Sequence, residues 1–305
     1  LAFTNKKEVG IGGDAMGEVI GAGFLSHVPT IMLPEAVRRE LNEGNEISLV
    51  PGLERLRTEV LDELRPDVVI VFDTHWFSLF EFIVTAHDRR EGIYTSEEVP
   101  RGLNQVHYDM LGDPALAEAL AAGASNAGVR CTANADPHLP VHYGTVNIAH
   151  YLNRGEKWLS VSICGTAGQD DFLRAGQGFG EAIRQSDHRV VLIASGSLSH
   201  RFYPMNELDQ HESSDPAHVI TPEARAADEQ RIAWWEQGDH ASVVNTMDEF
   251  MPHRPEGLFG HYLMMVAAVG GAACHAVGRR FSEYENAIGT GQVHMWFDRP
   301  ETGWT

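Results

Sequence analysis

The sequence predicts a single α/β domain with a mixed central sheet flanked by helices. Apolar segments that resemble buried strands alternate with segments at helical spacing along the whole chain. The composition, with 43% hydrophobic and 22% charged residues, is typical of a globular protein. No repeat and no linker-like stretch divides the chain. Residues 18–305 are therefore predicted to form one domain, preceded by an N-terminal extension, residues 1–17, whose order the sequence leaves open.

Strands are expected where short apolar runs are bounded by turn or polar residues. The clearest is VVIVF, residues 68–72 in DVVIVFDTH, a continuous apolar run of the kind that is buried on both faces of a sheet. The full set of expected strands comprises residues 18–27, 67–75, 80–86, 157–165, 189–200 and 290–297.

Helices are expected where apolar residues recur every three to four positions. In PGLERLRTEVLDELRP, residues 51–66, four apolar residues share this spacing and a proline stands at each border. Residues 262–278 look membrane-like, but the apolar run is short and glycines interrupt it, so a buried helix is expected there, over residues 257–276. The full set of expected helices comprises residues 51–66, 113–130, 170–186, 221–239, 240–250 and 257–276.

Charge and cysteine content restrict the partners and the compartment. The formal net charge of −20 argues against nucleic acid or an anionic membrane as partner, since phosphate binding needs a basic surface. It does not exclude an anionic substrate, because one local arginine is sufficient to bind it. The three cysteines are isolated from one another, and no apolar segment of a signal peptide opens the chain. A cytoplasmic protein is expected.

Three of the 16 histidines stand at the predicted ends of apolar strands. They are His27 in GFLSH, His75 in VVIVFDTH and His200 in VLIASGSLSH. Ligands of α/β sheets gather outside the carboxyl ends of strands, so three histidines at such ends favour one shared site. Two imidazoles and a carboxylate form a common divalent metal site, and a third histidine near neutral pKa suits acid–base chemistry. These features alone do not separate Fe(II) from Zn(II).

Two carboxylates compete for the third ligand position. Asp73 lies two residues before His75, and strand alternation puts both on the same side, as a ligand or as a group that orients His75. Glu256 lies in HRPEGLFGH, just before the expected buried helix, where a metal would compensate its charge. A carboxylate at a helix start is also favoured by the helix dipole, so the residues leave this choice open.

Five motifs in order along the chain resemble the class III (LigB-like) extradiol ring-cleavage dioxygenases. They are SHVP at 26–29, VFDTHW at 71–76, EGIYTSEEVP at 91–100, ASGSLSHRF at 194–202 and GTGQVHMWF at 289–297. The resemblance covers about residues 18–298, and within the class it is nearest to the 3,4-dihydroxyphenylacetate (homoprotocatechuate) 2,3-dioxygenases.

The resemblance implies Fe(II) held by His27, His75 and Glu256, with Asp73 as a residue behind the ligands. It implies that His200 faces the substrate and O2 as the catalytic histidine. Many relatives carry a second active-site histidine in an Asp-His-Gly run, whereas this chain has Tyr143 at that place, with His142 beside it. A phenol donates a hydrogen bond but is a poor base at neutral pH, so both residues are predicted only as substrate contacts.

The expected reaction is cleavage of a catechol ring by O2 to a muconic semialdehyde, with 3,4-dihydroxyphenylacetate as the first candidate substrate. The same chemistry on 2-aminophenol, protocatechuate or another dihydroxylated ring is the nearest alternative, and a zinc hydrolase is a second. A non-catalytic partner subunit is a third alternative, but such a chain should have lost ligands that are present here. The resemblance also implies a homo-oligomer, a dimer or tetramer.

Overall fold

The structure, a computed structural model, describes residues 16–305, so the predicted extension lies outside the described residues except for its last two positions. The main sheet has ten strands, and a two-stranded sheet accompanies it. The main sheet comprises β1 (Glu18–Leu25), β2 (Val68–Ser78), β3 (Phe82–Thr85), β4 (Arg89–Tyr94), β5 (Val106–Leu111), β6 (Cys131–Asn134), β7 (Lys157–Cys164), β8 (Arg189–Ser195), β9 (Gly278–Arg280) and β12 (Met295–Asp298). The small sheet comprises β10 (Glu285–Ala287) and β11 (Thr290–Gln292).

The sheet is mixed, as predicted. Its order is β4-β5-β7-β2-β8-β1-β12-β9, and β3 joins it through β7 and carries β6 at its other side. The central strands β7, β2, β8 and β1 run parallel to one another, whereas β12 pairs antiparallel with β1 and with β9. A sheet with parallel strands at its centre and antiparallel strands at its edge is common in large α/β proteins.

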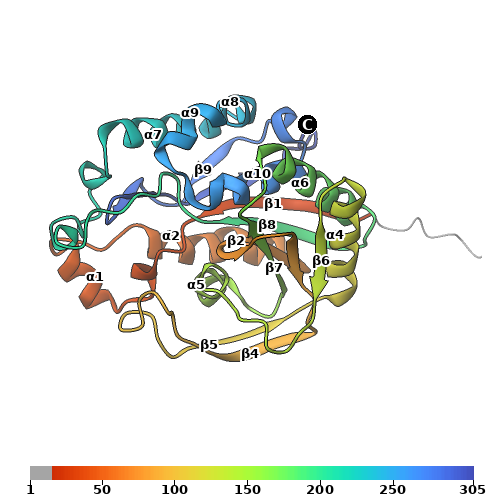
Figure 1. Cartoon of the computed structure of the whole chain (residues 1–305), viewed down its shortest axis with the longest axis horizontal. Helices are drawn as coiled ribbons and strands as arrows, with labels where there is room; N and C mark the ends of the chain where they lie inside the picture. The colour runs from red at the N-terminus through yellow and green to blue at the C-terminus, as the bar shows by residue number, and fades with distance from the viewer. Residues whose placement is uncertain (1–15) are drawn as a thin grey trace, which may run out of the picture.

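Helices cover both faces of the sheet (Figure 1). The α-helices are α1 (Glu35–Leu41), α2 (Leu49–Leu56), α3 (Asp62–Leu64), α4 (Pro114–Asn126), α5 (Tyr143–Leu152), α6 (Gln169–Arg184), α7 (Pro222–Glu236), α8 (His240–Asn245), α9 (Met247–Phe250) and α10 (Gly260–Ala268). Shorter helical segments are η1 (Pro29–Met32), the π-helical η2 (Arg57–Leu61), η3 (Leu208–Gln210), η4 (Pro216–His218), η5 (Met251–His253), η6 (Glu256–Phe259) and η7 (Gly271–Ala273).

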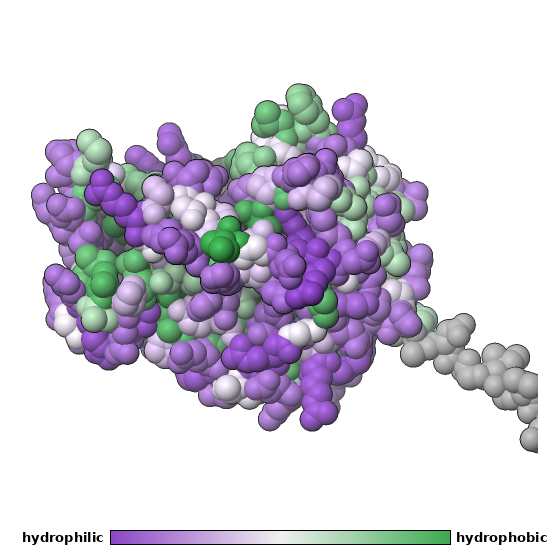
Figure 2. Space-filling view, turned by 90° about the horizontal axis from the view of Figure 1, so that it is seen from below, coloured by the Kyte–Doolittle hydropathy of each residue, from purple (hydrophilic) through white to green (hydrophobic). Residues whose placement is uncertain are grey.

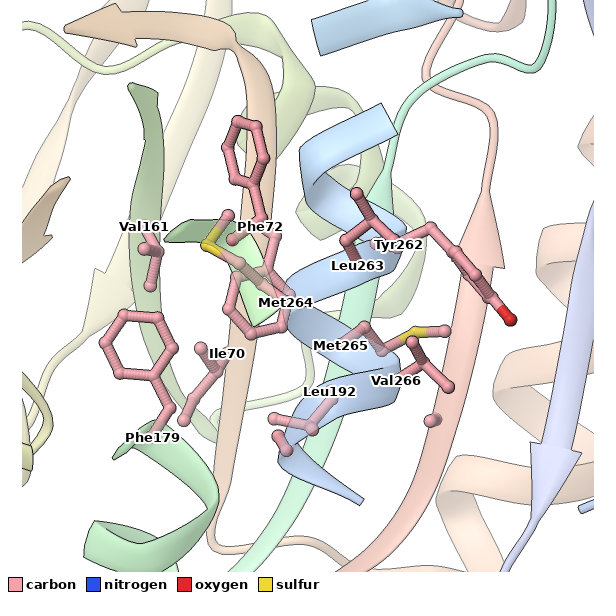
Figure 3. Close-up of a cluster of buried hydrophobic side chains, with 14 of the residues drawn as sticks. Ile70, Phe72, Val161, Phe179, Leu192, Tyr262, Leu263, Met264, Met265 and Val266 are labelled. Atoms are coloured by element: carbon pink, nitrogen blue, oxygen red, sulfur yellow. The ribbon is translucent and has the colours of Figure 1, made fainter. Parts of the chain in front are cut away.

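The sheet separates two hydrophobic cores, and β2 contributes to both by alternation. Ile70 and Phe72 face the core that α4, α6 and α10 cover, whereas Val69 and Val71 face the core that α2 and α5 cover. Figure 3 shows α10 lying against the sheet, with Met264 among the side chains that surround Phe72. Both faces of β2 are therefore buried, which explains its unbroken apolar run.

The register of three parallel strands places their carboxyl ends side by side. Ser195, the last residue of β8, pairs with Leu25, the last residue of β1, and with Asp73 of β2. The segments that follow these residues carry His27, His75 and His200. The three histidines therefore follow paired positions of β1, β2 and β8 at one edge of the sheet, although β2 continues to Ser78 and His200 lies beyond the end of β8.

Several predicted elements differ in extent from the observed ones. β2 runs three residues beyond His75, with an irregularity in its pairing between Asp73 and Phe77. The predicted strand 189–200 ends at Ser195, because the chain turns there toward the segment that bears Glu256. The predicted strand 290–297 is split at residues 293–294, and the long buried helix is limited to Gly260–Ala268. The helix at 51–66 begins two residues earlier, at Leu49.

The surface in Figure 2 is dominated by hydrophilic side chains, in keeping with the net charge of −20. Hydrophobic residues are visible, among other places, at the end of the molecule where Figure 1 places α1. Among residues 16–305, no helix combines the length and the apolarity that crossing a membrane requires.

Candidate metal centre and its cavity

His27, His75 and Glu256 form a cluster of metal-ligating side chains. Each offers one ligand atom, and the three atoms lie within 4.8 Å of one another. Nε2 of His27 and Nε2 of His75 are both 3.3 Å from Oε1 of Glu256. The three residues come from the loop after β1, from β2 and from η6, so the cluster exists only in the folded chain. This arrangement supports the predicted ligand set, which includes Glu256 and not Asp73.

Hydrogen bonds orient the buried His27 ring and identify its protonated nitrogen. Nδ1 of His27 lies 2.8 Å from Oγ of Ser195, and that hydroxyl donates a 2.6 Å bond to the carbonyl of Gly144. Because the hydroxyl proton is used on Gly144, the Ser195 oxygen accepts from Nδ1–H of His27. The lone pair of Nε2 then faces the cluster, as a metal ligand requires.

Glu256 is buried and fully hydrogen-bonded. The hydroxyl of Thr74 donates to Oε1 at 2.6 Å, and the backbone N–H of Ser197 donates to Oε2 at 2.6 Å. Burial alone would raise the pKa of Glu256, but His200, His27 and His75 face the carboxylate and hold its pKa well below the ordinary value. Glu256 is therefore a charged and buried carboxylate, a state that needs a cation or protonated partners nearby.

The backbone around Glu256 has an uncommon conformation. Leu258 and Phe259 have φ values of 58° and 59°, in the left-handed region that residues with a side chain rarely adopt. Gly257 between them and Glu256 also has a positive φ, 54°. Backbone of this kind costs free energy and persists where surrounding structure enforces it, which is common at functional sites. Here it turns the chain from the Glu256 segment directly into α10.

His75 is held from two sides. Its Nδ1 lies 3.5 Å from Oε1 of Glu98, and its ring centroid lies 3.7 Å from that of Tyr143. The Tyr143 hydroxyl donates a 3.0 Å hydrogen bond to the other Glu98 oxygen. Burial lowers the pKa of His75, but hydrogen bonds with Glu256 and Glu98 outweigh it and raise the pKa to about 10. A metal ion bound at Nε2 would displace this proton, because only neutral imidazole is a ligand.

Tyr143 lies in the cavity at the first position of α5, and His142 does not line that cavity. Burial raises the pKa of the Tyr143 phenol far above its ordinary value, so the hydroxyl donates hydrogen bonds and does not act as a base at neutral pH. The His142 ring stacks on Trp76, with centroids 6.1 Å apart. Its predicted role as a substrate contact stays a prediction.

Asp73 contacts His75 through the backbone and not through the ring. Its Oδ1 accepts the backbone N–H of His75 at 2.9 Å, and its Oδ2 accepts the Thr145 hydroxyl at 2.7 Å. Asp73 is buried and holds β2 against α5 at the position where the pairing of β2 becomes irregular. This placement agrees with a residue behind the ligands, although the imidazole itself is oriented by Glu98.

His200 stands opposite the ligands, with Nε2 4.0 Å from Oε2 of Glu256. Burial lowers the pKa of His200, so its imidazole is neutral at neutral pH. The segment that carries it is fixed by Asp228 of α7, which accepts bonds from the backbone N–H and the hydroxyl of Ser199 at 3.0 and 2.6 Å. Tyr284 donates a further 2.7 Å bond to Asp228.

A cavity of about 530 Å³ opens over this centre. Its lining includes the three candidate ligands together with Glu98, Tyr143, Ser197 and His200. The remaining wall comes from residues 28–49, from 99–102, from Phe202, Glu212 and Ser214, and from 285–290. A concave site of this size that joins apolar walls to a few converging polar groups is typical of small-molecule binding.

Sequence reasoning missed three residues that support the ligands: Thr74, Ser195 and Glu98. Thr74 and Ser195 stand inside the motifs VFDTHW and ASGSLSHRF, beside the histidines that drew attention. Glu98 stands in the motif EGIYTSEEVP, and only the resemblance of this motif to the family drew attention to it. No local spacing connects Glu98 to His75, because the fold brings the loop after β4 to the end of β2.

Comparison with known proteins agrees with this geometry. Residues 21–297 match the family described as the catalytic LigB subunit of aromatic ring-opening dioxygenase. The chain is 30% identical to 3,4-dihydroxyphenylacetate 2,3-dioxygenase of Escherichia coli, over 84% of this chain and 91% of that protein. It is 27% identical to the 2-aminophenol 1,6-dioxygenase beta subunit of a Pseudomonas species, over 95% of this chain and 97% of that one.

A solved structure of an uncharacterized protein from Escherichia coli K12 has the same fold, with a TM-score of 0.61 at 16% identity, over 91% of this chain and 99% of that one. The fold, the His-His-Glu cluster and the match over nearly the whole chain agree with one another. The chain belongs to the LigB family of class III extradiol dioxygenases, as a catalytic subunit of an aromatic ring-opening dioxygenase.

Proposed function

We propose that this protein is an Fe(II)-dependent extradiol dioxygenase that cleaves the ring of a catechol with O2 to a muconic semialdehyde. The observation that carries the proposal is the convergence of two imidazoles and one carboxylate on the cavity floor, with His200 facing them. The candidate substrate nearest to the relatives is 3,4-dihydroxyphenylacetate. 2-Aminophenol, protocatechuate and other dihydroxylated rings are the alternatives that the same centre would accept.

The side chains fit a ferrous ion. His27, His75 and Glu256 offer two imidazole nitrogens and one carboxylate oxygen, the set found in non-haem Fe(II) oxygenases with open coordination positions. The Nε2 lone pair of His27 faces the cluster because Nδ1 donates to Ser195. The chemistry that Fe(II) supplies when bound is electron transfer between an electron-rich ring and O2.

The residues of this chain then bind the ring and handle its protons. His200, neutral and facing Glu256 across the site, is placed to accept a proton from a catechol hydroxyl and to return it during ring opening. The Tyr143 hydroxyl donates its one proton to Glu98, so its oxygen is placed to accept a hydrogen bond from a substrate hydroxyl. The apolar walls of the cavity exclude water, which strengthens these polar contacts.

Three further expectations accompany the proposal. Residues 18–305 act as one catalytic domain, the protein works in the cytoplasm, and it assembles as a homo-oligomer, a dimer or tetramer. Size-exclusion chromatography with light scattering tests the assembly directly. The three cysteines are free and buried, which is compatible with a reducing compartment.

The test is anaerobic reconstitution with Fe(II), followed by addition of 3,4-dihydroxyphenylacetate and air. Oxygen uptake and a yellow ring-fission product are expected. His75→Ala should abolish stoichiometric iron binding, whereas His200→Ala should keep the iron and lose most turnover. His107→Ala, at an exposed position of β5, is the matched control and should behave as the unmodified protein. Full iron loading without turnover on any catechol or aminophenol would refute the proposal.

A further inference from the structure

We propose that the natural substrate is a catechol whose ring carries an uncharged, apolar substituent. This inference rests on the proposed ring-cleaving function and specifies its substrate class. It starts from the size of the cavity, about 530 Å³, which lies in the range of about 300–1,000 Å³ that encloses drug-sized ligands. A single dihydroxylated ring with a short acid side chain would leave much of this space unfilled.

The space beyond the metal centre is walled by aliphatic and aromatic side chains. Leu33 and Leu41 line it while remaining half exposed, so they are free to cover a ligand. Gly102, in the lining segment 99–102, approaches Leu33, whose Cδ2 lies 3.4 Å from where a Cβ of residue 102 would stand. The apolar lining side chains are Val28, Leu33, Leu41, Ile47, Leu49, Val99, Phe202, Ala287 and Ile288. Burying an apolar substituent against them removes hydrophobic surface from water.

The charges that line the cavity disfavour an anionic substituent. Besides the candidate ligand Glu256, three carboxylates line it: Glu98, Glu212 and Glu285. Burial raises the pKa of Glu212 and of Glu285, and neighbouring acidic residues raise it further. Glu285 is 94% buried, one of its oxygens accepts the backbone N–H of Ser48, and the other has no hydrogen-bond partner in the described part of the chain. A substrate carboxylate beside the buried Glu285 would meet the same desolvation and repulsion, whereas solvent weakens the repulsion by the exposed Glu98 and Glu212.

Arg101 is the one lysine or arginine among the described residues that line the cavity. It is exposed, and the surrounding water and salt weaken its attraction for a carboxylate. A carboxylate anchored by Arg101 is nevertheless the specific alternative, because it would make 3,4-dihydroxyphenylacetate the preferred ligand. An apolar wall and an Arg101 anchor predict opposite effects of substituent charge on binding affinity, so one pair of ligands distinguishes between them.

The experiment measures binding to the Fe(II)-loaded protein without oxygen, by isothermal titration calorimetry. The ligands are 3,4-dihydroxyphenylacetate and 4-isobutylcatechol, in which two methyl groups replace the two carboxylate oxygens at nearly the same shape. We expect 4-isobutylcatechol to bind at least about tenfold more tightly, in line with the selectivity of apolar pockets. Equal affinities, or tighter binding of the acid, would overturn the inference.

Two variants test the residues named. Leu41→Arg puts a cation in the apolar wall and should reduce or reverse the preference for 4-isobutylcatechol, whereas Leu111→Arg, on β5 and outside the cavity, should leave it unchanged. Arg101→Gln should lower the affinity for both ligands equally or leave both affinities unchanged. A loss of about tenfold confined to the acid would establish the Arg101 anchor instead.

Turnover assays under air with the same two compounds separate failure of this inference from failure of the proposed function. Absence of ring cleavage with every catechol would refute the function while leaving the measured binding preference intact. Ring cleavage with higher kcat/KM for the acid would refute the substituent class and support the function.

Discussion

The hydroxyl of Thr74 donates a 2.6 Å hydrogen bond to Oε1 of Glu256, a residue 182 positions further along the chain. The same carboxylate oxygen lies 3.3 Å from Nε2 of His75, the next residue after Thr74. The end of β2 therefore supplies one candidate metal ligand and also holds another in place.

Thr74→Val should weaken metal binding. The substitution keeps the shape of the side chain and removes the donor to Glu256, and loss of such a supporting contact commonly costs about 10–100-fold in metal affinity. Thr74→Ser should restore most of the affinity, and Thr58→Val, at an exposed helical threonine, should have no effect. Competition with a chromophoric chelator measures the affinity. Unchanged affinity in Thr74→Val would show that the bond does not position Glu256.

Tyr143→Phe should keep the metal and lower kcat/KM by less than about tenfold, since it removes one hydrogen bond to Glu98. His200→Ala should lower kcat/KM by about 10²–10⁴, the contribution expected of an acid–base group. Steady-state oxygen uptake at equal iron content compares the two variants. The raised pKa of the Tyr143 phenol argues against proton transfer from this residue. If Tyr143→Phe nevertheless lost as much activity as His200→Ala, Tyr143 would be the proton donor.

Gly144→Ala should destabilise the fold and disturb Asp73. A Cβ at position 144 would lie 2.1 Å from Oδ1 of Asp73, closer than any real contact, so the buried carboxylate or α5 must move. We expect a loss of about 1–3 kcal/mol in the free energy of unfolding, measured by urea titration. Gly168→Ala is the matched control, because its Cβ would be 3.8 Å from the nearest atom. Equal free energies of unfolding for both variants would mean that Asp73 moves away from the added Cβ without destabilising the fold.

Asp228→Asn should change how stability depends on pH. Burial raises the pKa of Asp228 from 3.8 to about 7, although hydrogen bonds from Ser199 and Tyr284 and the charge of Arg231 act against this rise. The folded state therefore holds the proton more tightly than the unfolded state. The stability that this proton contributes is fully present below about pH 4 and is lost as the pH rises to about 7.

The difference in unfolding free energy between the unmodified protein and Asp228→Asn should thus fall between pH 4 and pH 7, by a few kcal/mol at most. Above about pH 8 the difference should be constant. Urea titrations of both proteins at matched pH values give this difference directly and cancel the other titrating groups. A difference that rises with pH would mean that Asp228 is ionised in the folded protein throughout.

Sequence patterns predicted much of this molecule because they reflect local physics. The apolar run 68–72 identified the central strand, and the ordered motifs identified the family that the whole-chain match confirmed. The ends of elements were less predictable. The strand predicted to continue to His200 stops at Ser195, since the residues beyond it bond to segments near Pro255 and Gly291 that lie far away in the sequence.

Within the site, the residue types and the strand ends determined that His27, His75 and His200 would lie near one another, because parallel strands in register end at one edge of a sheet. Only the tertiary structure decided which carboxylate, Asp73 or Glu256, lies beside the imidazoles. Asp73 is close to His75 in sequence, yet its oxygens are used on the backbone of His75 and on Thr145. Glu256 reaches the cluster because a left-handed turn before α10 aims it inward, where Thr74 and Ser197 hold it. Sequence determines which groups are available at strand ends, and only long-range packing decides which oxygen remains free to meet the imidazoles.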